Sequence, residues 1–92
     1  MKAITINYFG VSSIITRRKK QSLSFDEEFN LFDLVNFLTK LYGSSLKKLF
    51  FDKDNEFKPL VMLLINGKPV EDYNYIINSK DEISITPLIA GG

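Results

Sequence analysis

Apolar and polar side chains alternate near the beginning of the chain with a period of two, the pattern of a strand that buries one face. The apolar positions are Ile4, Ile6 and Tyr8. They predict a first strand over residues 2–9. Gly10 and the stretch through Arg17–Lys20 interrupt this alternation, which resumes at Leu23 and Phe25. We therefore expect a long turn followed by an antiparallel strand over residues 20–26.

The spacing of apolar residues changes to three and four in the next segment, which is the spacing of one face of a helix. The residues on that face are Leu31, Leu34, Val35, Leu38, Leu41 and Tyr42. They predict one helix over residues 31–42. Asn30 is suited to cap its first turn, Asp33 lies near the positive end of the helix dipole, and Gly43 supplies the positive φ that often ends a helix. The apolar residues between Leu46 and Phe51 predict a short turn beneath the sheet.

Two further strands and a tight turn are indicated in the second half of the chain. Residues 60–65 are continuously apolar, which predicts a central strand covered on both faces. Asn66–Gly67 favours a type I′ turn, and residues 68–70 begin the return. Alternation at residues 82–86 predicts a last strand that ends at Pro87, because proline has no amide to continue the ladder. This order of elements predicts an α+β roll in which one main helix packs on a mixed sheet of four to five strands.

Composition restricts the chemistry that this chain can perform. It has 92 residues, of which 45% are hydrophobic, so one compact domain is expected. Twelve basic and eleven acidic side chains leave a net charge of +1, which names no partner. The chain has no cysteine and no histidine. Disulfides, thiol nucleophiles, most zinc sites and the commonest general base are therefore excluded, and we expect no bound cofactor or metal.

Hydropathy favours a soluble, cytoplasmic protein. The first residues lead directly into the alternating pattern, without the apolar core of a signal peptide. The longest aliphatic run, residues 60–65, is much shorter than the roughly 18 residues of a membrane span. We therefore expect no contact with a membrane.

Two charged segments are weaker signals. Arg17–Lys20 is a basic run that could contact nucleic acid or an acidic partner. The acidic residues 26–28 follow closely in the sequence, so a solvated turn is the favoured interpretation and nucleic acid is not expected as a partner. The acidic segment from Asp52 to Glu56 lacks the central glycine and the terminal bidentate glutamate of a calcium loop. It predicts a surface turn rather than a metal site.

The end of the chain carries its most specific pattern, in which leucine, isoleucine, alanine and two glycines follow a proline. This motif and three others are Pro87–Gly92, Phe9–Gly10, Ile65–Gly67 and Lys80–Ile83. In these motifs the chain resembles the β-grasp sulfur carriers, a family that includes the small subunit of molybdopterin synthase, the thiamine sulfur carrier ThiS and the ubiquitin-related modifiers of archaea and eukaryotes. The resemblance implies a β-grasp, ubiquitin-like domain over residues 1–87 and a flexible reactive tail over residues 88–92. Lys80–Asp81 and Pro87–Leu88 stand where this family often has Gly-Asp and Pro-Pro.

The resemblance implies a carrier rather than an enzyme. The carboxylate of Gly92 would be adenylated with ATP by an E1-like partner enzyme and then converted to a thiocarboxylate. The thiocarboxylate would deliver sulfur for molybdopterin or tungstopterin biosynthesis, or for a related thiolation, within an acceptor such as the large subunit of molybdopterin synthase. An alternative is a ubiquitin-like modifier that is joined through Gly92 to lysines of target proteins. A third is a binding module whose tail is inert.

The composition of the tail fits passage through a narrow channel of a partner. The tail consists of Leu88, Ile89, Ala90, Gly91 and Gly92. The two glycines have no β-carbon that would clash in such a channel. Ordering the tail costs roughly 5–10 kcal/mol at 1–2 per residue, whereas burying Leu88 and Ile89 returns about 3–6 kcal/mol. A docking face on the folded body is therefore required, and we expect it on the exposed side of the sheet near the tail, with Phe9 and Pro87 as members.

Overall fold

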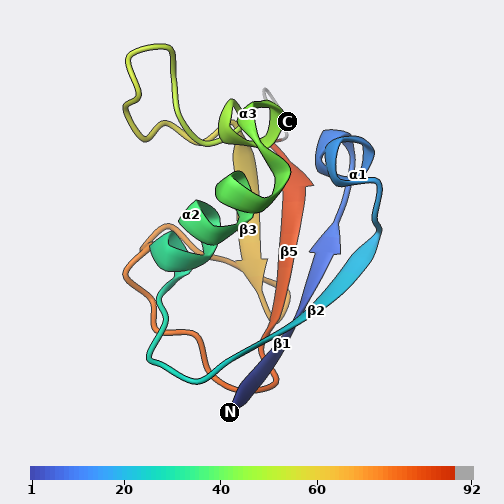
Figure 1. Ribbon diagram of the computed structural model, residues 1–92, viewed down its shortest axis with the longest axis vertical. Coiled ribbons are helices and arrows are strands. Elements are labelled where there is room, and N and C mark those ends of the chain that lie inside the picture. Colours follow the sequence, from blue (N-terminus) through green and yellow to red (C-terminus); the bar gives the residue numbers. More distant parts are fainter. Residues whose placement is uncertain (89–92) are drawn as a thin grey trace.

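The sheet of this protein has five strands, and its longest helix packs across one face of that sheet (Figure 1). The computed structural model describes residues 1–88. The strands are β1 (Lys2–Tyr8), β2 (Lys20–Phe25), β3 (Val61–Ile65), β4 (Lys68–Pro69) and β5 (Glu82–Pro87). The helices are α1 (Val11–Thr16), α2 (Leu31–Tyr42) and α3 (Ser44–Lys47). No helix within residues 1–88 is long and apolar enough to cross a membrane.

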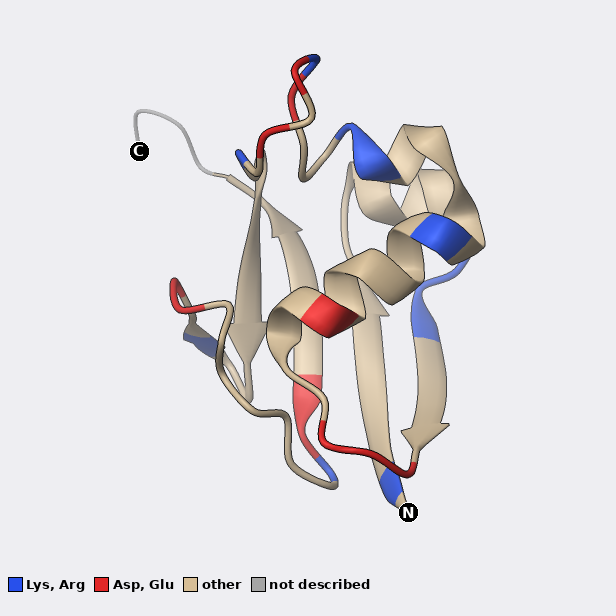
Figure 2. Cartoon of the chain, turned by 60° about the vertical axis from the view of Figure 1, so that its left-hand side comes forward, with Lys and Arg blue, Asp and Glu red and all other residues tan. Residues whose placement is uncertain are grey.

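The order of the strands is β2-β1-β5-β3-β4, so the last strand of the sequence lies at the centre of the sheet. β1 and β5 run parallel, with Ile6 opposite Ile83, whereas β2 and β3 run antiparallel to their neighbours. α2 lies across one face of the sheet (Figure 2), and the apolar sides of these strands meet the buried side of α2 in a single core. The predicted α+β roll, with a mixed sheet on one main helix, is therefore confirmed.

Local signals at both ends of α2 explain where this helix begins and ends. The Oδ1 atom of Asn30 accepts a hydrogen bond from the amide of Asp33 at 2.7 Å, and the Asp33 carboxylate accepts one from the amide of Asn30 at 3.0 Å. This reciprocal pair is a capping box, which satisfies two amides that the helix leaves free. Gly43, with a φ of 88°, follows the helix and donates its amide to the carbonyl of Thr39. The predicted range of residues 31–42 is confirmed.

One residue of the predicted helix face does not reach the core. Leu31, Leu34, Val35 and Leu38 are buried, whereas Leu41 is 53% exposed. At 100° per residue, Leu41 lies about 70° from the middle of the buried stripe. The prediction that Leu41 packs in the core is therefore wrong, because a spacing of three still drifts around the helix when it is repeated.

The segment between β1 and β2 contains α1, and it is not the long turn that the sequence predicts. Ser12 and Thr16 face the interior and are buried, while Ile14 is 75% exposed. The two buried hydroxyls remain paired, since Ser12 donates to the carbonyl of Phe9 at 2.9 Å and Thr16 donates to the carbonyl of Ser12 at 2.8 Å. In α1, polar residues face the interior while Ile14 faces solvent. The sequence therefore shows no apolar spacing of three and four residues that would predict this helix.

β3 is not covered on both faces, which corrects the prediction for residues 60–65. The odd-numbered residues of β3 are buried against the helices, while Met62 and Leu64 lie on the opposite face and are only half-buried. Leu60 precedes the strand and is 62% exposed. The central place belongs to β5, and β3 lies one strand nearer the edge. A continuous apolar run therefore does not by itself distinguish a strand buried on both faces from one with an open face.

A buried carboxylate fastens the turn after β3 to the start of β5. Asn66 and Gly67 have φ values of 52° and 85°, as the predicted type I′ turn requires. The side chain of Asn66 donates to Oδ1 of Asp81 at 2.9 Å, and Oδ2 of Asp81 accepts from the Tyr75 hydroxyl and from the Asn78 amide, each at 2.8 Å. Burial alone would raise the pKa of Asp81, but these hydrogen bonds outweigh burial and hold that pKa below its ordinary value.

A second polar group joins both layers of the fold. Oε1 of Gln21, on β2, accepts hydrogen bonds from the hydroxyl of Tyr8 at 2.7 Å and from the hydroxyl of Tyr42 at 2.6 Å. The two tyrosine rings meet edge to face, with their centroids 6.1 Å apart. The end of α2 is thereby tied to β1 and β2.

Candidate functional site

β5 carries the chain to one end of the sheet. The strand runs between β1 and β3, and the carbonyl of Ile85 accepts a hydrogen bond from the amide of Phe9 at 3.0 Å. Pro87 is the last residue of β5 and lies opposite Val61. Leu88 follows and is 47% exposed, so the described chain reaches the surface here. We term this end of the molecule, where β1 and β5 finish and β2 and β3 begin, the tail end.

The structure places three of the predicted site residues together and leaves four outside its scope. Phe9, which is 50% exposed, and the exposed Pro87 and Leu88 all lie at the tail end. The other predicted residues are Ile89, Ala90, Gly91 and Gly92, which lie outside the described residues. Their roles as tail and as reactive terminus stay predictions, as does the docking role of Phe9 and Pro87.

Gly10 lies directly against Pro87. Its backbone has a φ of 61° and a ψ of −135°, a conformation that residues with a side chain seldom adopt. A β-carbon at this position would lie 2.7 Å from Cγ of Pro87 and 3.4 Å from its Cδ. The carbonyl of Gly10 also accepts the amide of Ser13 at 3.1 Å, at the start of α1. The lack of a side chain therefore allows α1 to close over the last residue of β5.

Exposed apolar side chains gather at the tail end. Within residues 1–88, nine large hydrophobic residues are exposed, and six of them lie here. The six are Phe9, Val11, Ile14, Leu41, Leu60 and Leu88. Single exposed apolar residues are common on protein surfaces, but a group around one end of a molecule marks an interaction site. The sequence identified Phe9 and Leu88, whereas Ile14 was missed because the sequence does not predict α1.

Two tyrosines and one aspartate within residues 1–88 have pKa values that the fold moves away from neutrality. Burial raises the pKa of Tyr73 to about 12 and raises that of Tyr8 further, so both hydroxyls stay protonated at neutral pH. The pKa of Asp81 moves in the opposite direction, also away from neutrality. In the described part of the chain, no group of three or more acidic side chains is arranged to hold a metal ion. The pKa values of Tyr8, Tyr73 and Asp81 therefore do not mark any of these three as an acid or base tuned to neutral pH.

Comparison with known protein families decides the assignment. The family model described as Urm1, ubiquitin related modifier, matches residues 3–92. The chain belongs to the Urm1 family. A protein of Archaeoglobus fulgidus that is named as a candidate sulfur carrier is 32% identical over 69 residues, which cover 72% of this chain and 77% of that protein.

Two solved structures show the same fold as this Urm1-family protein. The solution structure of small archaeal modifier protein 1 from Methanosarcina acetivorans is 26% identical, with a TM-score of 0.77 over 100% of this chain and 98% of that one. A chain in the complex of subunits 1 and 2 of the molybdopterin-converting factor from Helicobacter pylori is 18% identical, with a TM-score of 0.62 over 98% and 99% of the two chains. The predicted resemblance to the β-grasp sulfur carriers and ubiquitin-related modifiers is confirmed.

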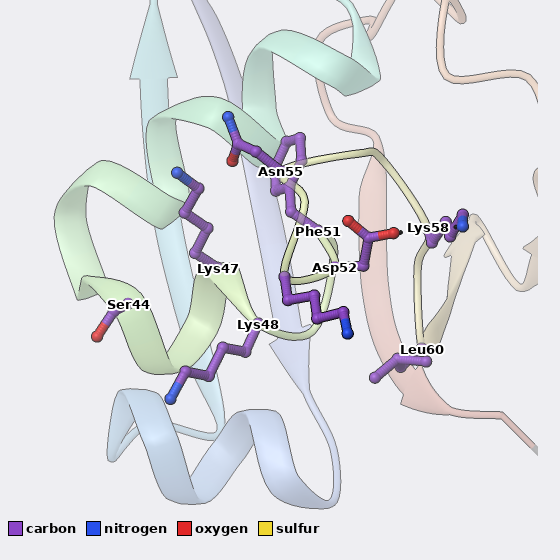
Figure 3. A pocket seen from close by; sticks show the side chains of 9 residues that line it. Ser44, Lys47, Lys48, Phe51, Asp52, Asn55, Lys58 and Leu60 are labelled. Carbon is purple, nitrogen blue, oxygen red and sulfur yellow. Dashed lines mark ion pairs between the residues drawn. The ribbon is translucent and has the colours of Figure 1, made fainter.

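The Urm1-family chain also has a shallow groove at the tail end, between α3 and the loop that leads to β3 (Figure 3). The groove is lined by Ser44, Lys47, Lys48, Phe51, Asp52, Lys53, Asn55, Lys58 and Leu60. Nζ of Lys58 pairs with Asp52 at 3.3 Å and with Glu56 at 3.5 Å. The backbone amide of Glu56 donates to Asp52, and this hydrogen bond, aided by Lys58, holds the pKa of Asp52 below its ordinary value. The predicted surface turn at residues 52–56 is thus an ordered loop with its own internal bonds.

Proposed function

We propose that this protein carries sulfur as a thiocarboxylate on Gly92. The proposal rests on the position of Leu88, where the described chain reaches the surface. It also rests on the match to the Urm1 family, which extends through Gly91 and Gly92. The name of the Archaeoglobus fulgidus relative supports the same function.

The proposed reaction activates the terminal carboxylate on a partner, because a free carboxylate is a poor electrophile. An E1-like enzyme joins a carboxylate oxygen of Gly92 to the α-phosphate of ATP, and pyrophosphate leaves. A sulfur nucleophile at the oxidation level of sulfide then attacks the carbonyl carbon, and AMP leaves, so that the terminus becomes a thiocarboxylate. The sulfur passes to an acceptor in a second protein, and water restores the carboxylate. The carrier supplies the reacting group and no catalytic side chain.

We further propose that the acceptor is a synthase subunit that docks at the tail end. The Helicobacter pylori structure, in which a chain of this fold is in complex with subunit 2 of the converting factor, supports a partner of this kind. Ordering the tail costs more than Leu88 and Ile89 return, so the folded body must contribute. Each exposed apolar side chain at the tail end that becomes buried adds about 1.5–3 kcal/mol. Phe9 and Ile14 are the largest contributors expected beyond the tail.

A protein modifier is the second candidate function. The family description and the name of the Methanosarcina acetivorans relative favour it. In this case the ε-amine of a lysine on a target protein attacks the activated carbonyl of Gly92, AMP leaves, and an isopeptide bond forms. The same activation of the terminus serves both functions, so the acceptor alone distinguishes them.

Intact-mass spectrometry of the protein purified from its native cells tests these proposals. Exchange of one terminal oxygen for sulfur is expected of the carrier, whereas Gly-Gly remnants on lysines of other proteins would support the modifier. A variant that lacks Gly91 and Gly92 is the control, and it should show neither product. Its thermal unfolding should stay nearly unchanged, because terminal residues contribute little to the core. An unmodified terminus and unmodified target lysines, in cells that make the pathway enzymes, would refute both functions.

A further inference from the structure

The charges of this protein are segregated along the strand direction (Figure 2). The tail end holds nine of the twelve basic side chains and three of the eleven acidic ones. The basic residues are Arg17–Lys20, Lys40, Lys47, Lys48, Lys53 and Lys58. The opposite end, where β1 and β5 begin, holds three basic and five acidic side chains, while Asp33, Glu71 and Asp72 lie between the two ends. Nine against three gives +6 at the tail end, three against five gives −2 at the other, and the three acidic residues between them complete the net charge of +1.

The direction of β2 produces part of this segregation. β2 begins at Lys20 and ends at Phe25, roughly 17 Å away at about 3.3 Å per residue. The acidic residues 26–28 are close to Arg17–Lys20 in sequence, but they lie at the opposite end of the molecule (Figure 2). Residues 26–28 are therefore too far away to neutralise the basic run, which is exposed at the surface as predicted.

The basic side chains of the tail end remain available to a partner. Within residues 1–88, the only ion pairs join Lys58 to the acidic loop that contains it. Lys47 lies 5.8 Å from the centroid of the Phe51 ring, and its ammonium group meets no carboxylate of the described residues. Lys48 and Lys53 are exposed and line the groove of Figure 3. Their desolvation on binding would be offset only by acidic groups supplied from outside.

The neighbours of these charges favour a protein partner over nucleic acid. Six exposed apolar side chains lie among the basic residues, and an apolar centre with a charged rim is the anatomy of a protein interface. Single-stranded nucleic acid is bound by several aromatic rings that stack on bases. At the tail end, Phe9 is the one exposed aromatic residue in the described part of the chain.

We propose that the basic tail end docks on an acidic rim around the entrance to the site where the activating enzyme receives the terminus. This inference rests on the proposed function. The interior of that site must accept two anions, ATP and a carboxylate, so acidic groups are tolerated at its entrance and not inside. An acidic entrance attracts the tail end, which carries +6, and repels the opposite end, which carries −2, so the chain arrives tail first. Such steering raises association rates about 10- to 1,000-fold and weakens as salt screens the charges.

The test compares kcat/KM for adenylation of the full chain by the E1-like enzyme of the same organism at low and high salt. The tail-end variant carries Lys48→Glu and Lys53→Glu. The matched control carries Lys68→Glu and Lys80→Glu at the opposite end, with the same change in net charge. We expect the tail-end variant to lose about 10-fold or more in kcat/KM at about 50 mM salt and about 2-fold or less at about 500 mM. The control should keep the rate of the unaltered protein or exceed it.

Each other outcome has a distinct meaning. Equal effects of the two variants, or a kcat/KM that does not change with salt, would overturn the acidic rim and leave the proposed function standing. A failure of the unaltered protein to be adenylated at any salt would remove the proposed function itself. Binding of a uridine homopolymer at about 150 mM salt, lost in the tail-end variant, would assign the basic end to nucleic acid instead. If thermal unfolding shows that the first variant is not folded, Arg18→Glu with Lys19→Glu repeats the test from the other flank.

Discussion

The contact between Gly10 and Pro87 predicts a large and specific cost for one added methyl group. In Gly10→Ala, the backbone conformation with φ of 61° and ψ of −135° costs about 1–3 kcal/mol in any residue other than glycine. The new Cβ would also lie 2.7 Å from Cγ of Pro87, so one of the two must move, and overpacking of this kind costs about 1–3 kcal/mol. Pro87 is exposed at the end of β5, and its ring has room to shift. We therefore expect a total loss of about 2–4 kcal/mol in the free energy of unfolding.

Urea denaturation of Gly43→Ala is the matched control. Gly43 has a φ of 88° and a ψ of −164°, so the backbone penalty is similar, but nothing lies within 4 Å of the position of its added Cβ. The difference between the two variants therefore measures the contact with Pro87. In a double-mutant cycle, Pro87→Ala should recover about 1 kcal/mol of the loss in Gly10→Ala, because the ring is gone. Equal losses at Gly10 and Gly43, without coupling to Pro87, would refute the reasoning.

Three other perturbations test the packing of the body. The folded pKa of Asp81 lies below the ordinary 3.8, so the stability that Asp81 contributes is complete above pH 3.8 and is lost as the pH falls through the folded pKa. In a series of unfolding free energies measured against pH, Asp81→Asn should therefore flatten the acidic part of the curve. An unchanged curve would contradict this role of Asp81. Gln21→Leu leaves two tyrosine hydroxyls without their acceptor and should cost about 1–3 kcal/mol in urea denaturation, whereas a loss of a few tenths would show that water replaces it. Leu41→Ala should change stability by about 0.5 kcal/mol or less and Leu38→Ala should cost about 2–5 kcal/mol, so equal costs would place Leu41 in the core after all.

Patterns carried by neighbouring residues predicted most of the fold. The bounds of α2 follow from its apolar spacing, from the cap at Asn30 and from Gly43, all of which act within a few residues. The turn at Asn66–Gly67 depends only on its own backbone. α1 was not predicted, because Ser12 and Thr16 can be buried only where local carbonyls accept their hydroxyls, and no apolar spacing reports such an arrangement.

The candidate site likewise has one part that neighbouring residues predict and another part that depends on the fold. The motif Pro87–Gly92 predicts a tail from its order of residues alone, without knowledge of the fold. The surface around the tail depends on strand directions. Arg17–Lys20 and Lys47 come together because β1 and α2 both finish at the tail end, while β2 carries residues 26–28 away. The order of charges along the chain does not predict this surface, because charged residues that are close in sequence lie at opposite ends of the molecule.

The central place of β5 has a mechanical consequence. A force applied at the end of β5 passes along this strand and is shared by the hydrogen bonds to β1 and β3. The load acts parallel to the strands, so the hydrogen bonds on both sides must break together rather than one after another, as they would when an outer strand is peeled away. The pairing of β5 with β1 and β3 is therefore the arrangement that best resists a pull along this strand.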